Sequence, residues 1–410
     1  MRSKYISVIF ILFLIIQCFS KTPDIRIGID IDQKSVVLES ERGLIIKTAS
    51  DREVVREKSI EFETTRTGFL INSNIDMRGD TLDIYPVSGM IRYDKKTFRG
   101  RFLLYKRSNK INVINVLSMK YYLYGVIGKE LLTSSPFESM KTLSVVCRTY
   151  ALKNRNKHGS QGFDLCNTTH CQVYDGYDAE TQQIRDAVDS TEGLVIKYDD
   201  ELISAYHFSA CGGATANNED VWEGGDAVPY LRGRWCEFCK ESPRANWEYD
   251  LKLSRLSRLM KDQNIGRIIR ISKEGSDAYG RVKTIRLTGT NGEKVVKGNF
   301  FRLRVGAGSM WSMNFDLVPY GGQSDKIQEK IEKLSELLPG RKKDMIKKIV
   351  IENEEKRNNI EYEGYKIKGH GSGHGVGMCQ WGAIGLSKQG FKFKDIIKFY
   401  YTGVEVVKEY

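Results

Sequence analysis

Beyond residue 20 the sequence contains no apolar run long enough to cross a membrane as a helix. It also has no internal repeat and no low-complexity tract, and none of its five histidines belongs to an HExxH pair. The missing pair argues against a zinc hydrolase of that type. Acidic residues number 52 against 64 lysines and arginines, which gives a formal net charge of +12. Because the positive charge is spread along the chain, it favours a polyanion-rich setting such as a cell wall over nucleic acid.

Residues 1–20 are typical of an export signal. Arg2 and Lys4 precede an apolar run from Ile6 to Ile16, which ends before the polar Lys21. Cleavage after Ser20 is the simplest interpretation. There are two alternatives. The segment could be a degenerate lipobox with lipidated Cys18, or it could stay as an N-terminal anchor. The remaining chain is therefore predicted to be exported to the cell envelope, either periplasmic or membrane-anchored.

The cysteines predict a crosslinked or metal-binding segment. Without Cys18 seven cysteines remain, an odd number, so at least one is a free thiol or some bind metal. Cys166, His170 and Cys171 place three zinc ligands within six residues, with a fourth expected from elsewhere. A Cys166–Cys171 disulfide is the competing interpretation in an oxidising compartment. Cys236 and Cys239 form a CxxC pair that would either add ligands or form its own bridge. For the reduced protein we expect about one structural zinc.

The hydrophobic pattern predicts an α+β protein. Residues 21–110 alternate in short runs typical of a β-rich region. Residues 111–410 mix strands and helices, with strands over Ile111–Leu117 and Met119–Ile127, and helices over Phe137–Tyr150 and Ala179–Thr191. Residues 323–361 are rich in Lys and Glu at helical spacing, which predicts a charged helical insertion with a break at Pro339-Gly340. A solvated surface insertion is the simplest role for this segment, and a partner-docking arm is the alternative.

Two segments are candidates for chemistry. Glu130 is predicted at a strand-to-helix junction among aromatic and aliphatic residues, where partial desolvation favours the protonated form that a general acid uses. Near the C-terminus, residues 369–383 alternate glycine with His370, His374 and other side chains. Such a run suits a loop whose backbone approaches another group closely.

Six segments, in this order, resemble the SpoIID/LytB family of stage II sporulation protein D and an amidase enhancer. They are Tyr122-Leu123-Tyr124-Gly125-Val126-Ile127 with Glu130; Glu138-Ser139-Met140-Lys141 with Arg148-Thr149-Tyr150-Ala151; Cys166 with His170-Cys171-Gln172-Val173-Tyr174; Ala187-Val188 with Thr191-Glu192-Gly193; Cys211-Gly212-Gly213-Ala214-Thr215; and Gly373-His374-Gly375-Val376-Gly377-Met378-Cys379-Gln380-Trp381-Gly382-Ala383. The likeness covers residues 110–321 and 362–405. Residues 131–135 and Leu143 depart from the family pattern, as does the insertion at 323–361.

This resemblance implies a peptidoglycan lytic transglycosylase with Glu130 as its catalytic acid and base. Arg148, Tyr174, His374 and Gln380 are assigned to substrate binding, and no cofactor is required for the chemistry. Glycan strands are the implied partner, together with a cell-wall amidase or another envelope protein.

Two other functions fit the same residues. One is a non-catalytic wall-binding amidase enhancer, as in LytB. The other is a metal-dependent hydrolase that uses His370, His374 and the Cys/His segment.

Overall fold

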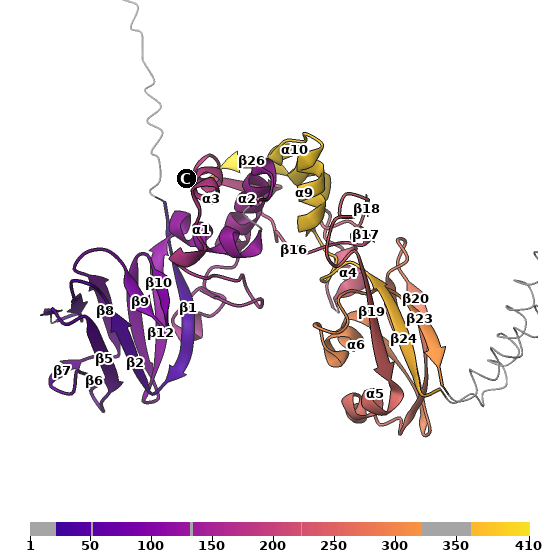
Figure 1. Ribbon diagram of the computed structural model, residues 1–410, viewed down its shortest axis with the longest axis horizontal. Coiled ribbons are helices and arrows are strands. Elements are labelled where there is room, and N and C mark those ends of the chain that lie inside the picture. The colour runs from indigo at the N-terminus through magenta and orange to yellow at the C-terminus, as the bar shows by residue number, and fades with distance from the viewer. Residues whose placement is uncertain (1–21, 51, 132–133, 223, 322–361) are drawn as a thin grey trace, which may run out of the picture.

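The computed structural model describes residues 22–50, 52–131, 134–222, 224–321 and 362–410. The predicted export signal of residues 1–20, with Cys18, and the predicted helical insertion at 323–361 lie outside these ranges. Figure 1 shows an elongated molecule with a β-rich lobe at each end and helices between them. The predicted α+β class is confirmed.

The N-terminal lobe contains two sheets that share one hydrophobic core; their strands pair antiparallel except β13, which joins β1 in parallel. Among the described residues, a seven-stranded sheet has the order β13-β1-β12-β11-β8-β3-β4 and a six-stranded sheet the order β10-β9-β2-β5-β6-β7. The predicted alternation is confirmed, since in β5 Ile60 and Phe62 are buried while their neighbours face solvent. The strands are β1 (Asp24–Gln33), β2 (Ser35–Glu39), β3 (Leu44–Lys47), β4 (Arg52–Val55), β5 (Ser59–Thr64), β6 (Gly68–Ile71), β7 (Ile75–Arg78), β8 (Thr81–Pro86), β9 (Ile91–Tyr93), β10 (Lys96–Phe98), β11 (Arg101–Arg107), β12 (Lys110–Ser118) and β13 (Leu165–Cys166).

The segment after β12 is a helix, so the strand predicted over Met119–Ile127 is wrong. Helix α1 (Met119–Glu130) begins after Ser118, whose hydroxyl accepts a hydrogen bond from the Tyr121 amide at 3.4 Å. Its aromatic residues have high strand propensity, but burial decides the local structure here. Tyr122 is fully buried and donates to Gln172 Oε1 at 3.1 Å.

Helices α2 (Phe137–Lys153) and α3 (Gln182–Asp189) were both predicted. The α2 N-cap is Pro136, and Glu138 in the first turn accepts a hydrogen bond from the Phe393 amide at 2.8 Å. Thr181 caps α3 through its hydroxyl. The hairpin of β14 (Leu194–Tyr198) and β15 (Glu201–Leu202) turns at Asp199-Asp200, with both residues at positive φ.

After this hairpin, His207–Phe208 form β16, which pairs with β25 (Met378–Cys379) in parallel. Short elements follow at β17 (Gly213–Ala214), α4 (Asn218–Val221) and β18 (Trp235–Cys236).

The second lobe has a hydrophobic core of its own. It contains β19 (Asn246–Lys252), α5 (Leu253–Leu259), β20 (Ile268–Ser276), β21 (Val282–Gly289), β22 (Gly292–Lys297), α6 (Gly298–Val305), β23 (Asn314–Tyr320) and β24 (Gly364–His370). Strand β24 lies between β19 and β23, and β21 lies between β20 and β22. The buried residues run from Trp247 to Ile367 and form a cluster separate from that of the rest of the chain.

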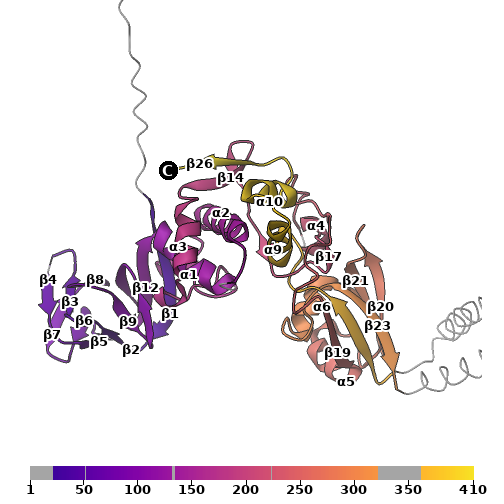
Figure 2. The ribbon, with the colours of Figure 1, turned by 45° about the horizontal axis from the view of Figure 1, so that its top comes forward.

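The C-terminal residues return to the middle of the molecule. Helices α9 (Gln380–Lys388) and α10 (Phe393–Tyr400) pack beside α2, as Figure 2 shows. Strand β26 (Glu405–Lys408) then pairs antiparallel with β14. Among the described residues, no helix combines the length and apolar character that a membrane crossing requires.

The predicted boundary at residue 110 does not separate two hydrophobic cores. Strand β12 begins at Lys110, but it pairs with β1 and β11 inside the N-terminal sheet. Buried residues from Ile25 to Val404 belong to one cluster, which joins the N-terminal sheets to the central helices. The separate core begins near residue 246 instead.

Candidate functional site

Glu130 lies at the end of α1 and faces the start of α9. The Gln380 side-chain amide donates a hydrogen bond to Glu130 Oε2 at 2.7 Å, although the two residues are 250 positions apart in the sequence. Glu130 is partly exposed, whereas Gln380 is 8% exposed. The junction predicted at Glu130 is therefore wrong about the element before it, because Glu130 ends a helix and not a strand. The structure does bring the predicted acid together with the glycine-rich run.

Close packing of α1 fixes where Glu130 emerges. A Cβ on Gly128 would overlap the backbone carbonyl of Ala179, and one on Gly125 would lie 2.6 Å from the Tyr174 ring. These glycines therefore let the helix approach the loop of residues 174–179. The burial of Tyr122 and Tyr124 on the same helix adds to this anchoring.

The glycine-rich run forms a loop whose alternate residues have a left-handed backbone. Gly371, Gly373, Gly375 and Gly377 have φ values of 75°, 109°, 92° and 78°, which L side chains rarely adopt. The loop passes close to other backbone, since a Cβ on Gly371 would lie 2.5 Å from the Ala210 carbonyl oxygen. The predicted close backbone approach is confirmed.

His374 is held in this loop through both ring nitrogens. Its Nδ1 accepts a hydrogen bond from the Val376 amide at 3.1 Å, so its Nε2 carries the proton and donates to the His207 carbonyl at 3.1 Å. Burial, with smaller effects of His207 and Arg302, lowers the pKa of His374 to about 3. His374 is therefore neutral at neutral pH, and both nitrogens are already engaged. These two hydrogen bonds show that His374 helps to position the loop, and its assignment to substrate binding stays a prediction.

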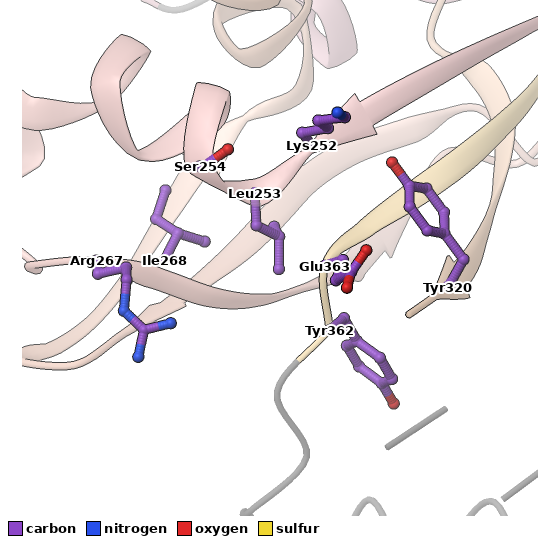
Figure 3. A pocket seen from close by; sticks show the side chains of 8 residues that line it. All are labelled: Lys252, Leu253, Ser254, Arg267, Ile268, Tyr320, Tyr362 and Glu363. Atoms are coloured by element: carbon purple, nitrogen blue, oxygen red, sulfur yellow. The ribbon is translucent and has the colours of Figure 1, made fainter. Parts of the chain in front are cut away.

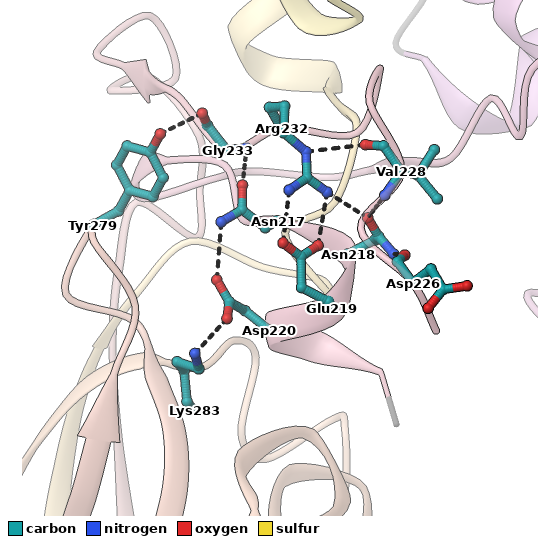
Figure 4. A network of polar contacts seen from close by, with 10 residues as sticks. All are labelled: Asn217, Asn218, Glu219, Asp220, Asp226, Val228, Arg232, Gly233, Tyr279 and Lys283. Atoms are coloured by element: carbon teal, nitrogen blue, oxygen red, sulfur yellow. Dashed lines mark hydrogen bonds and ion pairs between the residues drawn. The ribbon is translucent and has the colours of Figure 1, made fainter. Parts of the chain in front are cut away.

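A polar network surrounds α4, as Figure 4 shows. Glu219 of α4 forms an ion pair with Arg232 at 2.6 Å. Asp220 of α4 pairs with Lys283 of β21 at 2.5 Å, which ties α4 to the second lobe. The Trp222 ring, just after α4, lies 5.3 Å from the His374 ring. The network therefore holds the segment that carries Trp222 beside the histidine.

Arg148 and Tyr174 are interior residues, which corrects their assignment to substrate binding. Arg148 is 1% exposed, and its guanidinium donates to the carbonyl oxygens of Leu194 at 3.1 Å and Val188 at 3.4 Å. Burial lowers the pKa of Arg148, and Tyr410 opposes that shift. Tyr174 is 3% exposed and donates to Asn115 Oδ1 at 2.9 Å. Both residues hold elements of the core together.

The aromatic residues of α1 separate into core and surface positions. Tyr122 and Tyr124 are buried, and Tyr124 donates to Asp189 at 2.6 Å. Tyr121 is 40% exposed, with the Arg99 guanidinium 5.0 Å from its ring centre. Of the three, Tyr121 is the one that solvent and a sugar ring can reach. Trp381 is also partly exposed beside Gln380.

The structure brings His158 to the predicted metal ligands. One nitrogen or sulfur atom each of His158, Cys166, His170 and Cys171 lies within 4.8 Å of the others. His158 Nε2 lies 3.4 Å from Cys171 Sγ, and His170 Nδ1 lies 3.6 Å from Cys166 Sγ. In a zinc tetrahedron with ordinary bond lengths the S···N edge is about 3.6 Å. The four atoms therefore have the spacing of a Cys₂His₂ zinc site.

Neighbouring groups orient these ligands. His158 Nδ1 lies 3.2 Å from Gln161 Oε1, which leaves Nε2 for a metal, and Thr168 Oγ1 lies 3.3 Å from Cys166 Sγ. The hydrogen bond from the Cys171 thiol lowers the pKa of Cys166, which favours the thiolate that a metal binds. Sequence spacing missed His158, because it comes from the turn after α2, eight residues before Cys166.

Other clefts lie elsewhere in the structure. Figure 3 shows the residues that line a hollow of about 420 Å³ on the second lobe, which come from the end of β19, the start of α5 and β20, the end of β23, and Tyr362 and Glu363 before β24. Its lining does not include Glu130 or Gln380, so it is separate from the candidate catalytic site. A second cleft of about 340 Å³ includes His370, whose Nδ1 lies 2.8 Å from Asn246 Oδ1.

Comparison with known proteins identifies relatives. Residues 107–198 match the family described as stage II sporulation protein, SpoIID. The chain is 30% identical to an uncharacterized protein of Brachyspira hyodysenteriae over 334 residues, which are 80% of this chain and 75% of that protein. It is 28% identical to the amidase enhancer of Bacillus subtilis, over 82% of this chain and 48% of that protein. It is 24% identical to stage II sporulation protein D of Bacillus subtilis, over 74% of this chain and 78% of that protein.

Proposed function

The chain belongs to the SpoIID family, and we propose that it is a lytic transglycosylase that cleaves peptidoglycan glycan strands. The observation that carries this proposal is the hydrogen bond between Gln380 and Glu130. It sets a single, partly exposed carboxyl group at the meeting point of two segments that resemble the family.

The reaction requires one group that both donates and accepts a proton. Protonated Glu130 donates to the glycosidic oxygen between N-acetylmuramic acid and N-acetylglucosamine as the bond to C1 breaks. The resulting carboxylate then accepts the proton of the muramic C6 hydroxyl, whose oxygen bonds to C1 and closes a 1,6-anhydro ring. Since the nucleophile belongs to the sugar, no second carboxylate is needed, unlike in ordinary glycoside hydrolysis. Glu130 ends the cycle protonated again.

Charge and location fit this substrate. The net charge of +12 favours binding to an anionic wall, and the predicted export signal would deliver the chain to the cell envelope. The partly exposed Tyr121 and Trp381 lie on α1 and α9, the two helices that carry Glu130 and Gln380. Their rings would provide apolar faces for sugars beside the acid.

We further propose that His158, Cys166, His170 and Cys171 hold one structural zinc. The bound ion would fix the loop after α2, and Gln172 in that loop accepts the Tyr122 hydrogen bond from α1. Four protein ligands leave no position for water, so the zinc would stabilise the fold without entering the reaction. His158→Ala should lower the zinc content by about one per chain and lower thermal stability before activity. A His370→Ala control, changed outside the cluster, should keep its zinc. Unchanged zinc in the His158 variant, or a Cys166–Cys171 disulfide, would overturn this assignment.

A second function is favoured by the amidase enhancer relative. In that case the chain binds the wall and stimulates an amidase, and Glu130 is not needed. The same surface and charge would serve this role.

One experiment separates the two functions. Purified sacculi are incubated with the protein and with the variants Glu130→Gln and Glu405→Gln, and released muropeptides are analysed by mass. If the function is lytic, the unmodified protein releases anhydro products and a folded Glu130→Gln variant releases none. Glu405→Gln, which changes an exposed strand residue, is the control and should release them as the unmodified protein does. Normal turnover by Glu130→Gln would remove Glu130 from the mechanism. Sacculus binding and amidase stimulation without anhydro products would establish the enhancer function instead.

A further inference from the structure

Four cysteines outside the His158 cluster meet in the interior. Cys211 follows β16, Cys236 ends β18, Cys239 comes three residues later, and Cys379 ends β25. All four are at most 4% exposed. The sulfur atoms of Cys211, Cys236 and Cys379 lie within 4.8 Å of one another, and Cys239 Sγ lies 3.3 Å from Cys211 Sγ.

We propose that these four cysteines bind a second zinc ion as a tetrathiolate site. With Zn–S bonds of about 2.3 Å, the S···S edge of such a tetrahedron is about 3.8 Å, close to the spacing here. A four-iron cluster holds its cysteine sulfurs roughly 6 Å or more apart. The sulfurs of Cys211, Cys236 and Cys379 lie within 4.8 Å of one another, and Cys239 Sγ lies 3.3 Å from Cys211 Sγ, so the spacing favours a single ion. Among single ions, zinc binds such a soft site more tightly than iron(II).

Hydrogen-bond donors around the sulfurs favour thiolates. The amides of Cys211 and Gly382 both donate to Cys379 Sγ at 3.2 Å, and the Tyr400 hydroxyl lies 3.2 Å from Cys236 Sγ. The Gly382 amide belongs to the first turn of α9, whose positive end faces the site. A Cβ on Gly382 would lie 2.8 Å from Cys236 Sγ, so glycine allows the helix to approach the sulfurs.

A buried cation supplies a second, independent observation. Arg281 is 3% exposed; its Nη2 donates to the Cys211 carbonyl, and its Nη1 is buried without a hydrogen-bond partner among the described residues. Asp277, whose Oδ1 accepts a hydrogen bond from the Arg281 backbone amide, supplies one negative charge nearby. Burying a charge is costly, and zinc with four thiolates, at a net charge of −2, would add to this compensation.

The position of the site explains what the ion would do. Cys379 directly precedes Gln380, the residue that donates to Glu130. A zinc bound to Cys379 would tie the start of α9 to the segments that carry Cys211 and Cys236. The second zinc would therefore position Gln380, at a distance from the reacting atoms.

Metal content tests this inference without reference to activity. Protein purified under reducing conditions is predicted to contain two zincs per chain. One would have four cysteine ligands and the other two cysteines and two histidines. X-ray absorption at the zinc edge should therefore give an average of three sulfurs and one nitrogen per zinc. His158→Ala should retain one zinc with four sulfurs, whereas Cys239→Ser should retain one zinc with mixed ligands. Cys147→Ala, which changes a buried cysteine outside both clusters, should retain both.

Each contrary result identifies what is wrong. An average of two sulfurs and two nitrogens in the unmodified protein would refute the tetrathiolate site and leave the His158 cluster intact. Four sulfurs per zinc would support the tetrathiolate site and refute the other. Iron in place of zinc, or a disulfide among the four cysteines in non-reduced peptide mapping, would overturn the inference. The absorption measurement needs no variant, so it decides the question even if Cys239→Ser does not fold.

Discussion

The Gln380→Ala variant tests whether the contact between α9 and α1 positions the catalytic acid. The substitution removes the amide that donates to Glu130 Oε2 at 2.7 Å and leaves Glu130 in place. Since Gln380 is 8% exposed, water cannot freely replace the lost donor. Glu130 is then free to leave its orientation toward the glycosidic oxygen.

The size of the effect follows from the type of hydrogen bond. A hydrogen bond to a charged group contributes about 1.5–3 kcal/mol. Because about 1.4 kcal/mol corresponds to a factor of ten in rate, kcat/KM for anhydromuropeptide release should fall roughly 10- to 150-fold. Sacculus binding should change much less, since the lost contact is made to the acid.

A variant elsewhere on the same helix distinguishes positioning from general loss of structure. Gln389→Ala is the matched control, because Gln389 is exposed at the C-terminal end of the same helix and should retain full activity.

Two outcomes would refute this reasoning. A folded Gln380→Ala protein with unchanged activity would show that the contact does not position the acid. A rate loss accompanied by an equal loss of sacculus binding and a lowered melting temperature would assign Gln380 a structural role.

Three further predictions concern stability. Gly128→Ala should cost about 1–3 kcal/mol in urea unfolding because its Cβ meets the Ala179 carbonyl, whereas Gly308→Ala, with open space around it, should cost much less. Arg148→Met should lower stability and leave sacculus binding of the folded protein unchanged, whereas weaker binding would restore its substrate role. The lowered pKa of His374, about 3 against an ordinary 6.5, means that the unfolded state binds the proton first as pH falls. Stability should therefore drop by up to about 1.4 kcal/mol per pH unit below pH 6.5, and His374→Gln should reduce this slope.

Local patterns in the sequence determined those features that depend on neighbouring residues. Alternation predicted the N-terminal strands because each sheet has one buried face, and the apolar spacing of Phe137–Tyr150 predicted α2. Cys166, His170 and Cys171 were recognisable because three ligands lie within six residues. The resemblance to the family identified Glu130, although its local sequence alone did not distinguish it from other glutamates.

Tertiary structure decided the features that depend on distant residues. Met119–Glu130 became a helix because burial of Tyr122 and Tyr124 outweighed the strand preference of aromatic side chains. The carbonyl oxygens that accept hydrogen bonds from Arg148 lie some 40 residues away along the chain, on α3 and β14. No local pattern specifies such partners.

The candidate site shows the same division. The sequence by itself supplied the acid, the glycine-rich run and most of the ligand types. The pairing of Gln380 with Glu130, the addition of His158 to the first cluster and the meeting of Cys211 with Cys379 were decided by folding alone. These contacts join residues far apart along the chain, and their geometry depends on how the helices and loops pack around a shared core.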